Sequence, residues 1–246
     1  MKVNKSQRQV KIISEVHPQF MGDFNELTRM ILQSKIAGAD IVKVQLYESN
    51  KLFNNSDREY LEINKEELKH LYDFSGHHGI QLSASIFDEE RLGWCEEIGF
   101  ETYKIASRTL IDNPDLCQKI ISTKKNVIIS LGMYDYKKLG KPFNDSNIKY
   151  LYCVSKYPSS LEEIEMPDFS ESFFDGFSDH TIGISSCIYA VSRGAKIIEK
   201  HFSNSKNLNV ATQQAHTCSM DFNDLNLLRN LTDSITLLRH NIKNNK

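Results

Sequence analysis

The segment KIIEKHF (196–202) decides the fold prediction, because it carries three ionisable residues in a row beside an apolar pair. It follows a helix-like run, CIYAVSRGA (187–195), so we expect a short strand. Side chains alternate faces along a strand, which puts Glu199 and His201 on one face and Lys200 on the other. Burying a carboxylate and an imidazole together costs several kcal/mol unless each has a partner, such as a metal or a charged ligand. The alternative is a surface edge strand with solvated charges.

Seven further strand-like runs alternate with helix-like segments along the chain. They are residues 10–16, 40–47, 80–87, 102–107, 126–132, 148–154 and 173–180. Strands that alternate with helices pair in parallel through right-handed crossovers, and eight such units make a closed barrel. An open doubly wound sheet is the alternative, but it usually has fewer strands, and the sequence contains no GxGxxG or GxxxxGK[ST] motif. We therefore predict the α/β class and a single-domain (β/α)8 TIM barrel.

Capping residues mark several of the predicted helices. Asp23 can cap a helix that Gly38 can end. Asn64, with Glu67 three residues later, has the pattern of a capping box. The last run, residues 221–241, predicts an amphipathic helix whose apolar stripe contains Leu225, Leu228, Ile235 and Leu238.

The composition narrows the possible function classes. The chain has 246 residues, 40% of them hydrophobic, and a formal net charge of −2, so it can form one large core and has no basic footprint for nucleic acid. No apolar run approaches the roughly 20 residues of a membrane span, and the N-terminus lacks a signal-peptide core. The five cysteines never show CxxC spacing and indicate reduced thiols in a cytoplasmic protein. We expect one domain over residues 1–246, with a frayed tail from about residue 241.

Polar or ionisable residues lie late in nearly every predicted strand, where the active sites of (β/α)8 barrels are found. Each of these residues alone is better explained as solvated or bonded to the backbone, but their recurrence in eight successive strands indicates a site. Lysines and serines suit a small phosphorylated carboxylate, and two histidines suit a divalent metal. A nearby carboxylate can orient water or move a proton. The residues are Glu15, Lys43, Gln45, Ser85, Lys104, Ser107, Ser130, Ser155, Tyr157, Ser178, Asp179, His180, Glu199 and His201.

Two segments in this order, SDHTIG (178–183) and IIEKHF (197–202), resemble signatures of the sialic acid synthases. That family includes N-acetylneuraminate, legionaminate and pseudaminate synthases. The resemblance covers the catalytic barrel of the family and not its usual C-terminal antifreeze-like domain. Further similar segments are AGADIVKVQ (37–45), YKIAS (103–107), SLGM (130–133) and YCVSKYP (152–158).

The resemblance implies that phosphoenolpyruvate condenses with an aldose through C–O cleavage, giving a 2-keto-3-deoxy sugar acid and phosphate. The catalytic residues implied are His180 and His201, which would hold Mn²⁺ or Mg²⁺, and Glu15, which would position the attacking water. Tyr157 and Gln45 would face the sugar. The phosphoenolpyruvate site implied contains Lys43, Ser85, Lys104, Ser107, Ser130, Ser155, Ser178 and Glu199.

The sequence departs from the family pattern mainly on the sugar side. Gln19 and Phe20 replace an Asn-His pair, and Ala215 stands where the family has an aspartate that contacts the sugar. We therefore expect a non-standard acceptor. We also expect the long loop 204–216 to act as part of a lid, with three candidate sugar contacts, Gln213, Gln214 and His216.

Two other function classes stay open from the sequence. A non-catalytic family member could bind a ligand or a partner synthase, which the changed sugar residues favour and the intact lysine, histidine and glutamate set opposes. A different barrel lyase or aldolase could act on a phosphorylated acid, and a Schiff-base version would need a lysine with a depressed pKa. For the synthase we expect a homodimer.

Overall fold

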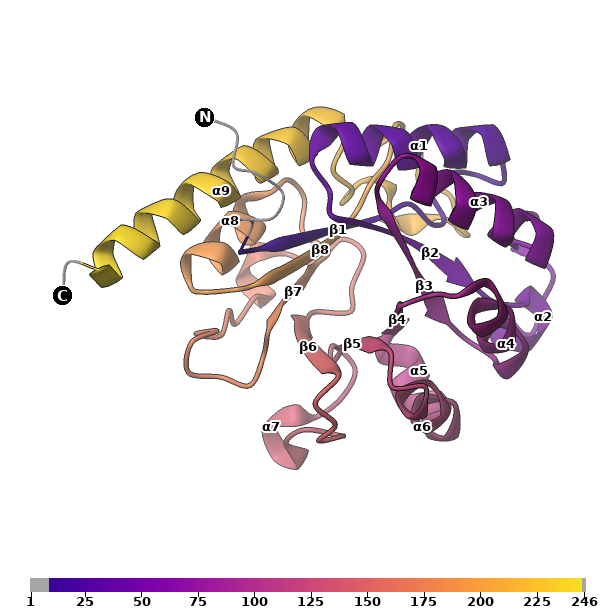
Figure 1. Ribbon diagram of the computed structural model, residues 1–246, viewed down its shortest axis with the longest axis horizontal. Coiled ribbons are helices and arrows are strands. Elements are labelled where there is room, and N and C mark those ends of the chain that lie inside the picture. Colours follow the sequence, from indigo (N-terminus) through magenta and orange to yellow (C-terminus); the bar gives the residue numbers. More distant parts are fainter. Residues whose placement is uncertain (1–8, 245–246) are drawn as a thin grey trace.

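The computed structural model describes residues 9–244 and forms a closed barrel of eight parallel strands (Figure 1). The strands follow chain order around the barrel, and β8 closes it by pairing with β1, so that His201 lies opposite Glu15. Every strand lies inside its predicted segment, and the (β/α)8 prediction is confirmed. The strands are β1 (Lys11–Glu15), β2 (Ile41–Leu46), β3 (Gln81–Ile86), β4 (Thr102–Ile105), β5 (Asn126–Ser130), β6 (Ile148–Cys153), β7 (Gly176–Asp179) and β8 (Ile197–His201).

Helices surround the barrel, and the caps predicted for α1 and α3 are confirmed. Asp23 accepts hydrogen bonds from the first turn of α1, Gly38 ends that helix at a φ of 110°, and Asn64 and Glu67 form a capping box. Between β6 and β7 the described chain has only a short 3₁₀ helix, η3 (Leu161–Glu163). The α-helices are α1 (Phe24–Ala37), α2 (Ser49–Phe53), α3 (Lys65–His77), α4 (Glu89–Ile98), α5 (Ser107–Asp112), α6 (Pro114–Ser122), α7 (Tyr136–Leu139), α8 (Ser185–Ser192) and α9 (Phe222–Asn244), and the other 3₁₀ helices are η2 (Glu59–Leu61) and η4 (Gln214–His216).

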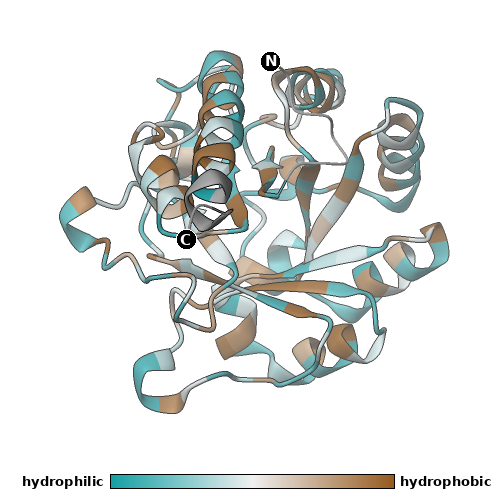
Figure 2. Cartoon of the chain, turned by 60° about the vertical axis from the view of Figure 1, so that its left-hand side comes forward, coloured by the Kyte–Doolittle hydropathy of each residue, from teal (hydrophilic) through white to brown (hydrophobic). Residues whose placement is uncertain are grey.

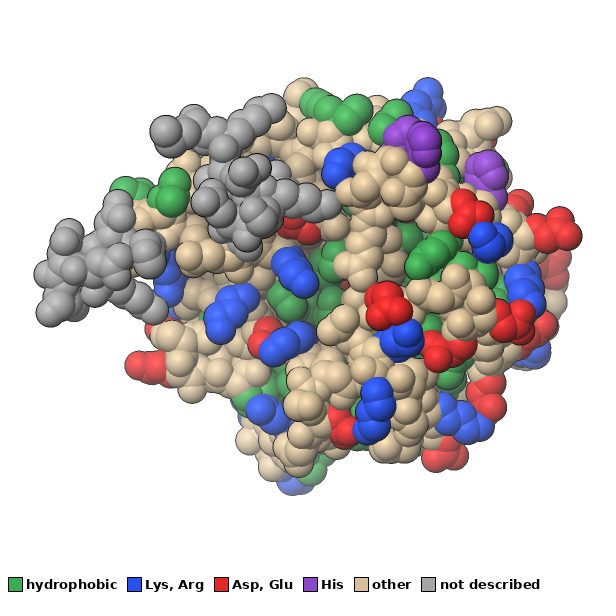
Figure 3. Space-filling view, viewed as in Figure 1, with side chains coloured by type: hydrophobic (Ala, Val, Ile, Leu, Met, Phe, Trp, Pro, Cys, Tyr) green, Lys and Arg blue, Asp and Glu red, His purple; other side chains and the backbone are tan. Residues whose placement is uncertain are grey.

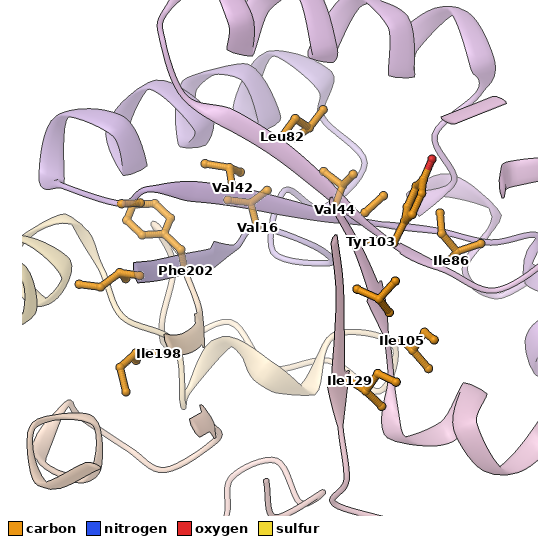
Figure 4. Packing of buried hydrophobic residues seen from close by; sticks show 14 of the residues in the cluster. Val16, Val42, Val44, Leu82, Ile86, Tyr103, Ile105, Ile129, Ile198 and Phe202 are labelled. Carbon is orange, nitrogen blue, oxygen red and sulfur yellow. The ribbon is translucent and has the colours of Figure 1, made fainter. Parts of the chain in front are cut away.

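The two faces of the barrel wall have different chemistry. The outward face is apolar and packs against the helices, as the buried side chains in Figure 4 show. The inward face has an apolar layer near the start of the strands and polar residues further along them, at the end where the site lies. The apolar layer consists of Ile13, Ile41, Ile128, Leu151 and Ile197.

The C-terminal helix α9 follows its predicted stripe only in part. Leu225 and Leu228 are fully buried, whereas Leu238 is 64% exposed, so the prediction was wrong at that end. Figure 1 shows why, because the second half of α9 runs out toward the edge of the molecule. The helix reaches Asn244, so residues 241–244 of the predicted tail are helical, and residues 245–246 lie outside the described part.

A buried ion pair joins the ends of β7 and β8 on the outer face of the barrel. Lys200 Nζ lies 2.7 Å from Asp179 Oδ2 and donates to the carbonyl oxygen of Thr181. Asp179 also accepts a hydrogen bond from Ser186 in α8. Burial alone would raise the pKa of Asp179, but the Lys200 charge and the hydrogen bonds from Lys200, the Thr181 backbone and Cys187 outweigh it and lower the pKa. The pair fixes the strand ends that carry His180 and His201.

The outer surface is mixed in character. Figure 2 shows helices with hydrophilic and hydrophobic residues on different sides, around strands that are mostly hydrophobic. Basic and acidic side chains both lie across the face shown in Figure 3. None of the helices in the described part of the chain has the length and apolar character needed to cross a membrane.

Candidate active site

A cavity of about 470 Å³ opens at the C-terminal ends of the barrel strands. It brings together most of the residues that the sequence singled out late in the strands and in the loops that follow them. The exception among the strand residues is Asp179, which faces outward and pairs with Lys200. Those that line it are Glu15, Lys43, Gln45, Ser85, Lys104, Ser107, Ser130, Ser155, Tyr157, Ser178, His180, Glu199, His201 and Gln214.

Two lysines and two glutamates form the charged centre of the cavity. Lys43 Nζ lies between two carboxylates, 2.8 Å from Glu15 Oε2 and 3.0 Å from Glu199 Oε2. Lys104 Nζ lies 3.9 Å from Glu199 Oε1 and donates a 2.9 Å hydrogen bond to the carbonyl oxygen of Ile105. All four side chains are buried, so each needs such partners to remain charged. The lysine with fewer partners is Lys104.

The pKa values of these groups diverge. For Glu199, burial would raise the pKa, but Lys43, Lys104 and a hydrogen bond from Ser178 outweigh it and bring the pKa to about 2. For Glu15, burial outweighs the pull of Lys43 and leaves the pKa raised. Burial lowers the pKa of Lys104 to about 8, against the opposing effect of Glu199. Glu199 is therefore a permanent carboxylate, while Lys104 can lose its charge in mildly alkaline solution.

Both histidines are oriented by bonds at the same ring nitrogen. His180 Nδ1 lies 2.8 Å from the carbonyl oxygen of Val154, and His201 Nδ1 lies 2.9 Å from Gln19 Oε1. Since these oxygens accept, each Nδ1 donates a proton and each Nε2 keeps its lone pair. Burial lowers the pKa of His180 to about 4 and the pKa of His201 well below its ordinary value. Two neutral imidazoles, with ring centroids 5.9 Å apart, thus present lone pairs near one another.

This donor set fits a divalent metal in an open site. Within the described residues, no three His, Cys, Asp or Glu side chains gather into a complete set of metal ligands. Two imidazoles would leave the remaining positions to water or substrate oxygens, as catalytic metal sites do. The hydrogen bond at each Nδ1 is the kind of outer partner that orients a histidine ligand.

The serines on the opposite side of the cavity are prepared for a ligand. Ser107 Oγ donates to the carbonyl oxygen of Ser130 and accepts from the backbone N–H of Gly132. Ser130 Oγ is buried and has no hydrogen-bond partner among the described residues. Buried hydroxyl groups are nearly always bonded, so this hydroxyl at the cavity wall is free to bond a ligand atom. A Cβ at position 132 would lie 2.4 Å from Ser155 Oγ, which explains the glycine.

The loop 204–216 reaches the cavity, as the lid prediction requires. Thr212, Gln214 and Ala215 line the cavity together with His180 and His201. Ala215 offers no polar side chain at the place where the sequence pattern expects an aspartate. Of the three sugar contacts predicted in this loop, Gln214 therefore lines the cavity.

The other two predicted sugar contacts of this loop, Gln213 and His216, do not line the cavity. Gln213 donates a 2.7 Å hydrogen bond to the hydroxyl of Tyr60, and its Oε1 lies 2.8 Å from His216 Nε2. His216 Nδ1 is bonded in turn to Ser203 Oγ at 2.7 Å. Both side chains are buried in contacts that anchor the loop from behind.

Several residues of the cavity were missed from the sequence. Gln19 was read only as a departure from the family pattern, yet it bonds His201 because β1 and β8 are neighbours in a closed barrel. Most of the others lie in loops beyond the strand ends, where strand alternation gives no signal. They are Pro18, Tyr47, Leu52, Phe53, Arg58, Phe87, Ala106, Arg108, Met133, Cys153 and Thr212.

These features define a class of protein, a (β/α)8 barrel with a balanced cluster of lysines and glutamates and two neutral histidines at the strand ends. The chain belongs to the NeuB family, whose model matches residues 30–244. It is 32% identical to the pseudaminic acid synthase of Helicobacter pylori, over 87% of this chain and 70% of that protein. It is 29% identical to the N,N'-diacetyllegionaminic acid synthase of Legionella pneumophila, over 92% of this chain and 72% of that protein.

A solved structure shows the same architecture. The N-acetylneuraminic acid synthetase of Leptospira borgpetersenii, in complex with citrate, matches with a TM-score of 0.79 and 30% identity. The match covers 93% of this chain and 84% of that chain. The chain spans about two thirds of the length of the curated relatives that it matches.

Proposed function

We propose that this protein condenses phosphoenolpyruvate with an aldose-type acceptor to give a 2-keto-3-deoxy sugar acid and phosphate. The observation that carries the proposal is one cavity with two complementary ends. One end has lysines and a buried, unpartnered serine hydroxyl that suit a phosphorylated carboxylate, and the other has two imidazoles suited to a divalent metal. The names of the relatives, which are synthases of sialic-acid-type sugars, support the same reaction.

The lysines divide the work on phosphoenolpyruvate unequally. Lys43 is already neutralised by Glu15 and Glu199, so its main role is to hold these two carboxylates in place. Lys104 has one carboxylate at 3.9 Å and is the cation available to an incoming anion. The hydroxyl groups of Ser85, Ser130 and Ser155 would donate to the phosphate and carboxylate oxygens. Ser107 and Ser178 also line this part of the cavity, but their hydroxyl protons already go to the carbonyl oxygen of Ser130 and to Glu199.

The histidine end is suited to the acceptor. Mn²⁺ or Mg²⁺ held by the Nε2 atoms of His180 and His201 would polarise the acceptor carbonyl. Imidazole ligands favour Mn²⁺ over Mg²⁺, since Mg²⁺ prefers oxygen donors. The Tyr157 ring lies 4.1 Å from the His180 ring, so it forms one wall of the space that the acceptor would enter.

The reaction forms a C–C bond and a C–O bond to water, and it breaks the C–O bond of the enol phosphate. C3 of phosphoenolpyruvate bonds to the carbonyl carbon of the acceptor, water adds to C2, and phosphate leaves with the electrons of the C2–O bond. The water oxygen becomes the new keto oxygen, and its two protons end on the acceptor oxygen and on the phosphate. We assign to Glu15 the role of taking a proton from water, and its raised pKa supports this assignment because it brings the carboxyl closer to neutral pH, where a general base works best. Its carboxylate is oriented by the backbone N–H of His17 at 3.0 Å.

The acceptor is expected to differ from N-acetylmannosamine. Ala215 cannot replace an aspartate contact, and Gln19 is occupied by His201. Each lost hydrogen bond typically costs about 0.5–1.5 kcal/mol, so two or three losses lower affinity by roughly tenfold to a thousandfold. The homodimer and the cytoplasmic location stay predictions.

The test is consumption of phosphoenolpyruvate with Mn²⁺ across aldoses and N-acetylated hexosamines. We expect turnover with at least one acceptor, poor turnover of N-acetylmannosamine, loss of activity in EDTA and recovery with Mn²⁺. His201→Ala should stay folded and lose the response to metal. Absence of consumption with every acceptor contradicts the synthase proposal and favours the non-catalytic member, whereas full activity in chelator contradicts the metal role.

A second candidate is an aldolase that forms a Schiff base, which the lowered pKa of Lys104 favours. Lys104 remains near Glu199 and donates to a backbone carbonyl, so its lone pair is not free for attack below that pKa. Borohydride reduction of the protein with pyruvate, whose keto group can form a Schiff base, separates the two candidates. A covalent adduct on Lys104 would support the aldolase, and none is expected from the synthase.

A further inference from the structure

Two arginines lie together at the mouth of the cavity and have no part in the proposed chemistry. Arg58 and Arg108 both line the cavity, and both guanidinium groups lie over the ring of Phe53, at 4.3 Å and 5.5 Å from its centroid. Arg58 is half-buried and Arg108 is exposed, whereas Lys43 and Lys104 are buried deeper in the same cavity. The arginines therefore form an outer cationic site, distinct from the inner one.

This outer site carries positive charge without a paired carboxylate among the described residues. Within the described residues, neither guanidinium forms an ion pair or a side-chain hydrogen bond, and the acids that line the cavity, Glu15 and Glu199, are already paired with Lys43. Stacking on one aromatic ring holds both guanidinium groups in place before a ligand arrives. A planar guanidinium fork matches the oxygens of phosphate and carboxylate groups.

The order of the strands in the barrel indicates which substrate would reach the arginine site. Arg58 follows β2 and Arg108 follows β4, whereas His180 and His201 end β7 and β8. In the closed order of eight strands β4 lies opposite β8, so Arg108 lies across the mouth from His201. Arg58 follows β2, two strands from β8, and reaches the same place through its contact with Phe53. An acceptor with its carbonyl at the histidines would extend across the mouth toward the arginines.

We propose that the acceptor carries an oxyanion, as a phosphate monoester or a carboxylate, at the end remote from its carbonyl, and that Arg58 and Arg108 bind it. The inference rests on the proposed function and narrows its substrate class to acidic sugars. It also explains how a cavity that has alanine in place of a sugar-contacting aspartate, at Ala215, can still select an acceptor.

The experiment compares each aldose or N-acetylated hexosamine with its 6-phosphate and with the matching hexuronate. Consumption of phosphoenolpyruvate is followed by its ultraviolet absorbance in the presence of Mn²⁺. We expect kcat/KM for an anionic form to exceed that for the neutral sugar by about tenfold or more. A preference for the 6-phosphate identifies a phosphate monoester, and a preference for the hexuronate identifies a carboxylate.

Arg58→Gln and Arg108→Gln should each remove most of this preference and raise KM for the acceptor, while KM for phosphoenolpyruvate stays the same. The matched control is Arg29→Gln, a change at an arginine of α1 with a 64% exposed side chain, which should change neither value. Equal turnover of neutral and anionic sugars would overturn this inference and leave the synthase proposal intact. A raised KM for phosphoenolpyruvate with an unchanged KM for the acceptor would overturn it too, because the arginines would then serve the other substrate.

Discussion

Lys43 and Lys104 are two lysines of one cavity with different electrostatic surroundings. Lys43 contacts two carboxylates, and the opposing charges raise its pKa despite burial. Lys104 has one distant carboxylate, and burial lowers its pKa to about 8. The first residue holds the cavity together, whereas the second is available to a ligand.

Substitution should separate these two roles. Lys104→Met removes a charged contact to phosphoenolpyruvate and should weaken its binding by about 1.5–3 kcal/mol, roughly tenfold to a hundredfold. Lys43→Met leaves Glu15 and Glu199 buried without their shared cation and should lower the free energy of unfolding by about 3–5 kcal/mol. Calorimetry and urea unfolding measure the two effects. Unchanged affinity in Lys104→Met would contradict the assignment.

The pH dependence follows from Lys104. Its pKa of about 8 means that the charge is present below that pH and is lost as the pH rises through it. We expect kcat/KM for phosphoenolpyruvate, which reports the free protein, to fall above about pH 8. In Lys104→Arg the cation persists, so any remaining activity should lack this alkaline limb. If kcat/KM of Lys104→Arg still falls above about pH 8, the titrating group is not Lys104.

At the scale of elements, the site depends on how β7 and β8 are joined. The two histidines lie at the ends of these strands, and the Asp179–Lys200 pair ties the same strand ends together from the outer side. The sequence predicted that Lys200 faces away from Glu199, because side chains alternate along a strand. It did not predict that the outward lysine is fully buried, since the covering helix α8 and the partner Asp179 come from separate segments.

Breaking this pair should destabilise the barrel. Asp179→Asn leaves Lys200 buried without its counter-charge and should lower the free energy of unfolding by about 3–5 kcal/mol, measured by urea unfolding. The matched control is Asp73→Asn, whose pair with Lys69 is more than half exposed and is worth at most about 1 kcal/mol. Because the pKa of Asp179 is lowered, its contribution is present above the ordinary aspartate pKa and is lost as the pH falls. Similar effects of both substitutions would contradict this account.

At the scale of the whole molecule, strand alternation made most of the inner site predictable. Apolar and polar residues recur with a period of two along short strands, and a closed parallel barrel brings the ends of all strands to one cavity. That geometry placed Glu15, Lys104 and His201 together from the sequence alone. The comparisons confirm the family and the fold, whereas the roles of individual residues stay predictions.

The loops beyond the strand ends could not be predicted in the same way. Loop conformation depends on contacts such as that of Gln213 with Tyr60, which joins the loops after β8 and β2. No periodic pattern encodes such a contact, so Gln213 and His216 were expected to face the sugar, while Arg58 and Arg108 went unnoticed. The residues at the acceptor end of the cavity could therefore be identified only from the structure.

The central claim is that this cavity breaks the C–O bond of phosphoenolpyruvate during condensation. Its most direct test uses phosphoenolpyruvate labelled with ¹⁸O at the bridging oxygen, with Mn²⁺ and the acceptor that gives turnover. Mass spectrometry of both products then locates the label. We expect labelled phosphate and an unlabelled 2-keto-3-deoxy acid, because water supplies the new keto oxygen. Label in the sugar acid, with unlabelled phosphate, would mean that the P–O bond breaks and would contradict the proposed chemistry.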